Sequence, residues 1–189
     1  EDGIRDHCVT GVQTCALPIW SLDCDVTNLV HQLRPDGPQA IVGVGGSRDI
    51  QAALRAGHEP VVGVEVNGLL LDLLRSPMGA PARVAADPRV RLVHDDGRSW
   101  LRRTDRRFRV IQASLIDTWA ATGAGAHALT ENGLYTVEAW RTFLDRLEPG
   151  GIFTVSRWYQ ASSRDETARM VVLATAALLE RGVPRPADH

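Results

Sequence analysis

Apolar residues along the chain gather into five short runs, and stretches with helical spacing lie between them. Each run is almost continuously apolar, as expected of a strand that is buried on both faces of a sheet. The five strands are predicted at residues 40–44, 61–65, 90–93, 108–113 and 152–155. Apolar residues three or four positions apart predict helices at residues 25–33, 48–56, 68–75, 98–102, 137–147 and 165–181. This alternation of strands and helices predicts a parallel sheet with helices on both faces.

Four polar clusters directly follow the first four predicted strands. They are a glycine-rich loop at residues 43–46, then Glu65, the pair Asp95 and Asp96, and the segment 114–117. In open parallel sheets, ligands bind at the carboxyl ends of the strands, at the point where the strand order reverses. The sequence therefore predicts a doubly wound, Rossmann-like α/β fold with a ligand site at this edge.

The glycine loop and the acid after the second strand indicate a nucleoside site. Glycines let backbone N–H groups approach a ligand where a helix begins, and a carboxylate can accept hydrogen bonds from both ribose hydroxyls. A dinucleotide fingerprint also needs glycine at the sixth position of the loop. Gly43 and Gly45 match its first and third positions, but the sixth is Arg48. This favours S-adenosylmethionine (AdoMet) over NAD. The alternatives are a tight turn without a ligand and, for Glu65, a solvated acid at a strand end.

The first nineteen residues differ in character from the rest of the chain. Residues 9–19 read VTGVQTCALPI, which resembles a translated short-read sequencing adapter, with its index at residues 7–8. We therefore expect residues 1–19 to be an artefact and residues 20–189 to form one domain. Without that segment the formal net charge changes from −2 to zero, which favours neither nucleic acid nor an anionic surface as a partner. Cys24 is then the remaining cysteine, and we expect it to be buried.

The same motifs carry a family resemblance. The chain resembles the spermidine/spermine synthase family, a branch of the class I AdoMet-dependent methyltransferase fold. The resemblance rests on the glycine loop, Glu65, the pair Asp96-Gly97 and the segment SLIDTWAATGAGAHALTENGLYTVEAW. The likeness spans residues 23–159. It implies AdoMet or decarboxylated AdoMet as the cofactor. The family's nucleoside contacts fall on Gly43 and Gly45 with the adjacent Gly46, its ribose contact on Glu65, and its adenine contact on Asp96 and Gly97.

Two acids that the resemblance associates with aminopropyl transfer are replaced. Polyamine synthases carry an aspartate in the glycine loop, where this chain has Gly46, and a D-x-x-D pair after the fourth strand. The positions of that pair are Ser114 and Asp117 here, so the first acid is a serine. A hydroxyl without an adjacent base is a poor proton acceptor. Asp117 is therefore the candidate that orients the acceptor or acts as the base, with Ser114 as a second candidate.

The expected function is an AdoMet-dependent transferase that passes a methyl or related group to a small-molecule acceptor. One alternative is true aminopropyl transfer in polyamine synthesis. Another is a non-catalytic nucleoside-binding module, because the resemblance extends to bacterial proteins that carry membrane spans upstream of such a domain. No stretch approaches the roughly 20 apolar residues that cross a bilayer, so we expect a cytoplasmic domain whose parent protein is soluble or membrane-anchored.

Other residues have simpler interpretations. One of Asp95 and Asp96 is expected to cap the following helix, and Arg48 and Asp49 either pair locally or meet the methionine part of the cofactor. The histidines show no ligand spacing, so no metal site is predicted. Folds of this class usually end with two further strands, so we expect a domain truncated at both ends. Its exposed strand edges would favour association between copies, which leaves homo-oligomerisation open.

Overall fold

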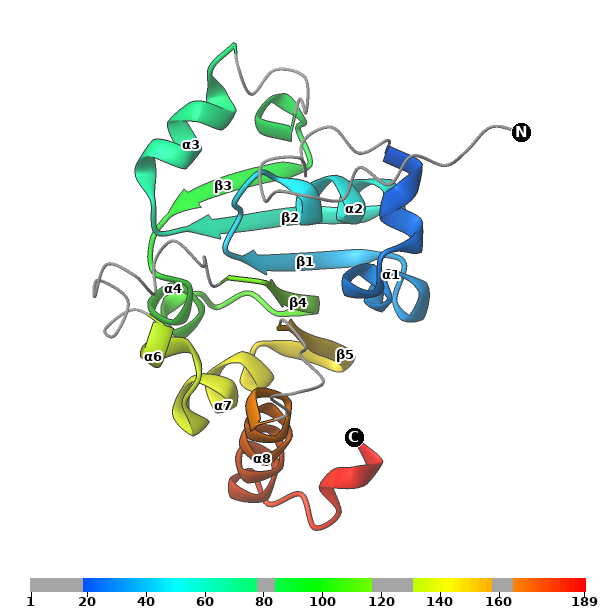
Figure 1. Cartoon of the computed structure of the whole chain (residues 1–189), viewed down its shortest axis with the longest axis vertical. Coiled ribbons are helices and arrows are strands. Elements are labelled where there is room, and N and C mark those ends of the chain that lie inside the picture. The colour runs from blue at the N-terminus through cyan, green and yellow to red at the C-terminus, as the bar shows by residue number, and fades with distance from the viewer. Residues whose placement is uncertain (1–18, 78–83, 117–130, 158–164) are drawn as a thin grey trace.

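The computed structural model describes residues 19–77, 84–116, 131–157 and 165–189, and Figure 1 shows one sheet flanked by helices. Its five parallel strands follow the order β3-β2-β1-β4-β5. They are β1 (Gly37–Val42), β2 (His58–Glu65), β3 (Val90–His94), β4 (Phe108–Ser114) and β5 (Leu147–Ser156). The chain runs outward from β1 to β3 and then returns to the other side of β1 with β4. The strand order therefore reverses at β1, which confirms the doubly wound α/β fold.

Seven α-helices lie within the described residues. They are α1 (Val30–Leu33), α2 (Arg48–Ala56), α3 (Gly68–Arg75), α4 (Gly97–Arg103), α6 (Glu131–Leu134), α7 (Val137–Asp145) and α8 (Asp165–Glu180). Both α2 and α3 have the predicted bounds. Helix α2 ends at Gly57, which adopts a left-handed conformation, and Asn67 caps the first turn of α3 by accepting a hydrogen bond from Leu69 N.

The predicted helix over residues 25–33 is wrong as a single element. The segment divides into a 3₁₀ turn, η3 (Val26–Asn28), and the one-turn helix α1. The Asp25 carboxylate accepts hydrogen bonds from Thr27 N at 2.8 Å and from Thr27 Oγ1 at 2.7 Å. Such a local side-chain turn competes with the helical hydrogen bonds that the apolar spacing predicted.

The predicted start of the fifth strand at residue 152 is also wrong, because residues 147–151 already belong to β5. Strand β5 begins at Leu147, and its pairing with β4 shifts register between Phe108 and Val110. Among the described strands β5 lies at an edge of the sheet, where Pro149 is tolerated although it lacks an N–H group. Gly150 has a φ of +74°, and this left-handed residue lies within the stretch of β5 where the register shifts.

Two apolar cores cover the two faces of the sheet. Alternate residues of β1 and β2 point to opposite faces, so Val42 and Val62 join one core while Ile41 and Val61 join the other. The first core is closed by α4, α6, α7 and α8 through Leu101, Leu134, Ala139, Trp140, Phe143 and Ala177. The second is closed by α2, α3 and the 3₁₀ turn η4 (Val84–Ala86) through Ile50, Ala53, Leu74 and Val84. This packing fixes the carboxyl ends of the strands, where the predicted site lies.

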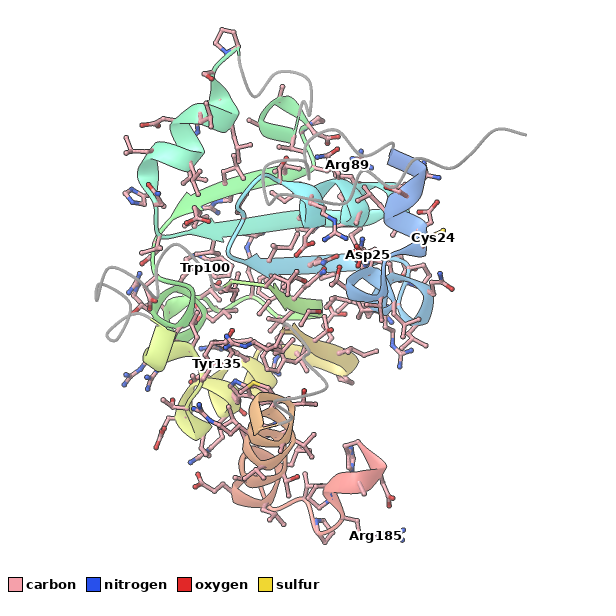
Figure 2. All side chains as sticks on the ribbon, in the orientation of Figure 1. Cys24, Asp25, Arg89, Trp100, Tyr135 and Arg185 are labelled. Atoms are coloured by element: carbon pink, nitrogen blue, oxygen red, sulfur yellow. The ribbon has the colours of Figure 1, made fainter. Side chains whose placement is uncertain are left out.

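Two further observations bear on the sequence predictions. Cys24, in the 3₁₀ turn η2 (Ile19–Cys24), is exposed (Figure 2), so the expected burial is wrong. No helix in the described parts of the chain is long and apolar enough to cross a membrane.

Candidate ligand site at the carboxyl edge of the sheet

The Glu65 side chain lies at the end of β2, where it joins two loops. Its Oε2 atom accepts hydrogen bonds from Val44 N at 3.0 Å and from Gly45 N at 3.2 Å, and its Oε1 atom accepts one from Asn67 N at 2.9 Å. The side chain is buried, with 6% of its surface exposed. Glu65 therefore fixes the glycine loop against the turn before α3. A carboxylate offers about four acceptor positions, so one is left for a ligand hydroxyl.

The glycine loop after β1 turns sharply before α2. Gly43 has a φ of +80° and Gly45 a φ of +48°, a left-handed region that side chains rarely adopt. A Cβ atom built on Gly45 would meet no atom within 4 Å, and Gly46 is exposed. The backbone of the loop is therefore open on the side of Gly45. This geometry suits a close approach by a ligand, and it brings the loop to the predicted position beside Glu65.

The two acids after β3, Asp95 and Asp96, have different partners within the protein. Asp96 caps α4, because its Oδ1 atom accepts a hydrogen bond from Ser99 N at 2.8 Å. Asp95 pairs with Arg103 and also accepts a hydrogen bond from Asp96 N at 2.9 Å. Of the two acids, Asp96 is the cap that the sequence expected at this turn. The adenine contact assigned to Asp96 stays a prediction, for which its second carboxylate oxygen is the relevant atom.

Gly97 lies directly on β1. A Cβ atom built on Gly97 would lie 2.4 Å from Cγ1 of Val42, far inside van der Waals contact. Packing of α4 against β1 therefore accounts for a glycine at this position without any ligand. Its role toward the cofactor stays a prediction.

This contact leads to a stability prediction. Gly97→Ala is expected to lower the free energy of unfolding by about 2 kcal/mol, because Val42 and the first turn of α4 must move apart. Urea unfolding measures the change. Gly133→Ala is the matched control, since a Cβ atom there meets nothing within 4 Å and is expected to leave stability within about 0.5 kcal/mol. Equal effects of the two substitutions would contradict the packing argument.

Ser114 is the last residue of β4, and its hydroxyl contacts a side chain of the same strand. Its Oγ atom accepts a hydrogen bond from Gln112 Nε2 at 2.9 Å. Asp117, the other candidate for proton transfer, lies outside the described residues. The role of Ser114 toward a ligand stays a prediction.

Asp49 lies in the first turn of α2, directly after the glycine loop. It is buried, with 7% of its surface exposed, and burial raises the pKa of its carboxyl group. The Ser114 hydrogen bond and the charge of Arg48 oppose that rise more weakly. Arg48 forms an ion pair with Asp25, so it does not neutralise Asp49 exclusively.

Solved structures with the same arrangement place the chain in a known fold, while no protein-family model matches it. The spermidine synthase from Thermotoga maritima superposes with a TM-score of 0.56 at 18% identity, over 82% of this chain and 51% of that one. A spermidine synthase in complex with the transition state analogue AdoDATO gives 0.54 at 17% identity, over 82% and 50%. The chain has the fold of the spermidine synthases. It spans about half the length of each of these two proteins.

This fold is also that of class I methyltransferases, as the sequence predicted. The precorrin-6y C5,15-methyltransferase from Geobacter metallireducens GS-15 superposes with a TM-score of 0.50 at 17% identity, over 80% of this chain and 68% of that one. In the spermidine synthase fold of this chain, the glycine loop, Glu65 and Asp96 follow neighbouring strands β1, β2 and β3. The fold thus brings three of the predicted cofactor-binding elements to one edge.

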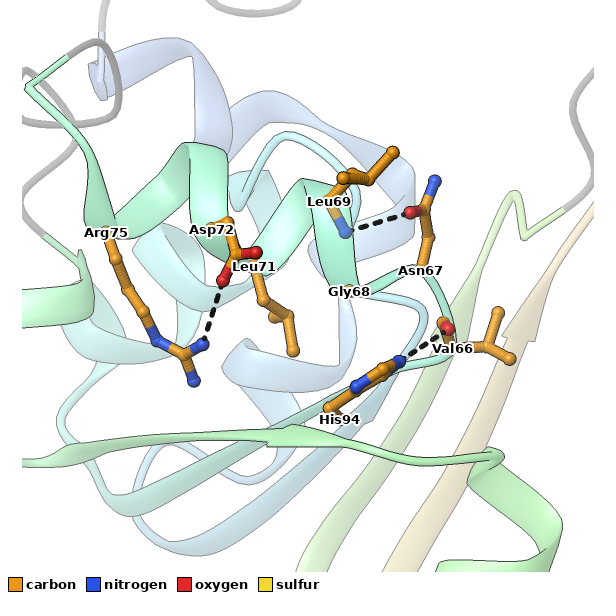
Figure 3. A pocket seen from close by; sticks show the side chains of 8 residues that line it. All are labelled: Val66, Asn67, Gly68, Leu69, Leu71, Asp72, Arg75 and His94. Carbon is orange, nitrogen blue, oxygen red and sulfur yellow. Dashed lines mark hydrogen bonds and ion pairs between the residues drawn. The ribbon is translucent and has the colours of Figure 1, made fainter.

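A cavity of about 550 Å³ lies beside this edge, on the side of α3 (Figure 3). The ring of His94 and the first turn of α3 line it, and His94 Nε2 lies 3.1 Å from the Val66 carbonyl oxygen. Neither the glycine loop nor Glu65 lines this cavity. The candidate site is therefore the edge where Glu65 meets the glycine loop, and this cavity is not part of it. Within the described ranges, no three acidic, histidine or cysteine side chains are grouped as metal ligands would be.

Proposed function

We propose that the chain is a spermidine synthase-like, AdoMet-dependent transferase domain that passes a methyl or related group to a small-molecule acceptor. One observation supports this most directly. A buried carboxylate, Glu65, is fixed by backbone N–H groups against an open glycine loop at the point where the strand order reverses. This is where a parallel α/β fold holds a nucleoside.

The residues at this edge fit an adenosyl group. Glu65 has an acceptor position left for a ribose hydroxyl, and Gly45 offers backbone that no side chain covers. Asp96 would accept a hydrogen bond from the adenine amino group through the oxygen that does not cap α4. A bound sulfonium supplies an already activated carbon. The protein then contributes mainly by holding the acceptor in line with that carbon.

Gly46 and Ser114 favour a reaction other than aminopropyl transfer. Gly46 is exposed and carries no carboxylate toward the loop, and a serine occupies the end of β4. Aminopropyl transfer to a polyamine remains the second candidate because the fold is that of spermidine synthases. The two candidates differ in the form of the cofactor that they require.

Calorimetric titration of the full chain with AdoMet and, separately, with decarboxylated AdoMet tests the proposal. We expect AdoMet to bind with a micromolar or lower Kd, about −8 kcal/mol or stronger. A clear preference for the decarboxylated form would overturn methyl transfer in favour of polyamine synthesis. Absence of binding of either ligand by a cooperatively folded sample would overturn the AdoMet assignment itself. Binding of AdoMet without turnover of any acceptor would favour the non-catalytic module.

A further inference from the structure

A second cavity lies between α2 and the segment that precedes β1. It has a volume of about 500 Å³, and η2, α1 and the second half of α2 contribute to its lining. Figure 1 shows α1 beside α2, and both η2 and α1 pack against that helix. His31 in the lining contacts His58, the first residue of β2, whereas Glu65 of the proposed cofactor site is the last residue of that strand. This cavity is therefore separate from the cofactor site.

The lining includes a buried histidine with one unpartnered ring nitrogen. The His31 side chain has 7% of its surface exposed, and its Nε2 atom has no hydrogen-bond partner among the described residues. The other ring nitrogen, Nδ1, lies 3.1 Å from Nε2 of His58, which does not line the cavity. The edge of the His31 ring that points away from His58 therefore faces the cavity.

The hydrogen-bond pattern makes Nε2 of His31 an acceptor. His58 Nδ1 lies 3.0 Å from the Gly37 carbonyl oxygen, which can only accept, so His58 carries its proton on Nδ1. His58 Nε2 then accepts from His31 Nδ1, which leaves His31 Nε2 with a lone pair and no proton. Burial, and secondarily His58, lower the pKa of His31 to about 4, so the ring stays neutral near pH 7. A buried acceptor without a donor is costly, which favours a ligand that supplies one.

The rest of the lining suits an uncharged and largely apolar ligand. The apolar residues of the lining are Leu22, Pro35, Ala52 and Ala56. The charged residues Asp23 and Arg55 are joined by hydrogen bonds of 2.7, 2.9 and 3.0 Å, so their charges neutralise each other. Asn28 already donates through Nδ2 to the Leu22 carbonyl oxygen at 3.0 Å, and Gln32 is exposed. A mostly apolar lining with a single placed polar group is typical of small-molecule sites.

We propose that this cavity binds an uncharged, mainly apolar small molecule that donates one O–H or N–H hydrogen bond to Nε2 of His31. The inference does not depend on the proposed function, because it involves neither Glu65 nor the glycine loop. Phenol is a simple probe of this ligand class. Anisole is its matched control, because it has the same ring and oxygen atom but no proton to donate.

NMR of the full chain with ¹⁵N-labelled histidine near pH 7 tests the inference, with His31 assigned through His31→Gln. On titration with phenol, the His31 Nε2 resonance should move toward that of a hydrogen-bonded nitrogen and saturate with a Kd of about 1 mM or lower. Anisole should bind at least about fivefold more weakly, because the hydrogen bond to His31 is lost. An Nε2 resonance that does not respond to phenol would overturn the proposal. The same response to both probes would overturn it too, because the donated proton would then contribute nothing.

A cavity-filling variant tests where the probe binds. Ala56→Leu places a larger side chain in the lining and should weaken phenol binding at least about tenfold through steric overlap. Its His31 and His58 resonances without ligand should stay close to those of the wild type. Ala86→Leu is the matched control, since Ala86 is exposed in η4 and does not line the cavity, and it should bind phenol as the wild type does. Wild-type affinity of Ala56→Leu for phenol would place the probe elsewhere and overturn the proposal.

Discussion

Glu65→Gln is expected to abolish measurable AdoMet binding and to lower the free energy of unfolding by about 2 kcal/mol. The carboxylate accepts backbone hydrogen bonds from Val44, Gly45 and Asn67 on its two oxygens. An amide has a single acceptor oxygen, so its NH₂ group would face N–H donors on one side. The glycine loop would then lose its attachment to the turn before α3. A ribose would also lose its charged partner, because hydrogen bonds to a carboxylate are roughly twice as strong as neutral ones.

Urea unfolding and calorimetric titration with AdoMet measure the two effects on the same sample. Glu59→Gln is the matched control, because Glu59 lies on the same strand and is exposed. We expect the control to bind AdoMet as the wild type does and to unfold within about 0.5 kcal/mol of it. AdoMet binding by Glu65→Gln at wild-type affinity would contradict the ribose assignment even if stability falls.

Acidification is expected to destabilise the protein by up to about 3 kcal/mol through one buried histidine. His31 in α1 and His58 at the start of β2 lie together, with His31 Nδ1 3.1 Å from His58 Nε2 and His58 Nδ1 3.0 Å from the Gly37 carbonyl oxygen. The carbonyl can only accept, so His58 carries its proton on Nδ1 and accepts from His31 through Nε2. These tautomers follow from the hydrogen-bond pattern, and both rings are neutral.

Burial, and secondarily the nearby His58, lower the pKa of His31 from 6.5 to about 4. The pKa of His58 is lowered as well, chiefly by burial. Between pH 6.5 and about 4 the unfolded chain therefore binds a proton at His31 that the folded chain does not. The resulting stability is fully present above pH 6.5 and is lost as the pH falls toward 4.

Urea unfolding over this pH range measures the effect. The wild type should lose stability steadily as the pH falls, and His31→Gln should show a shallower dependence because it has no ring to titrate. Its stability at about pH 7 is expected to be lower by about 1 kcal/mol, since the bond to His58 is weakened. An identical pH dependence in the two proteins would show that His31 is not the group responsible.

Local sequence signals determined the elements of this protein and their order. Helices α2 and α3 have their predicted bounds because a left-handed Gly57 and the capping side chain of Asn67 act within one turn of the helix ends. The apolar runs identified all five strands, since strands buried on both faces leave few polar positions. Together these signals were sufficient for the doubly wound fold and for the position of the glycine loop at its carboxyl edge.

The same local signals failed where long-range contacts decide the outcome. The fifth strand begins five residues earlier than predicted, because pairing with β4 extends β5 through Pro149 and Gly150. From the sequence, Gly97 was assigned to an adenine contact, but the nearness of Val42 on β1 already requires a small residue there. Neither contact can be predicted from the neighbouring sequence, because each joins residues that are far apart in the chain.

In the candidate site, too, some features could be predicted from local sequence and others depend on long-range contacts. The sequence alone singled out Glu65 and the glycine loop, because their chemistry and their positions after buried strands can be read locally. Only the tertiary structure determined that Glu65 holds that loop in place and that Asp49 is buried. The physical reason is that periodicity and capping act over a few residues. By contrast, the partners of a buried side chain are set by strand order and helix packing, which join segments far apart in the chain.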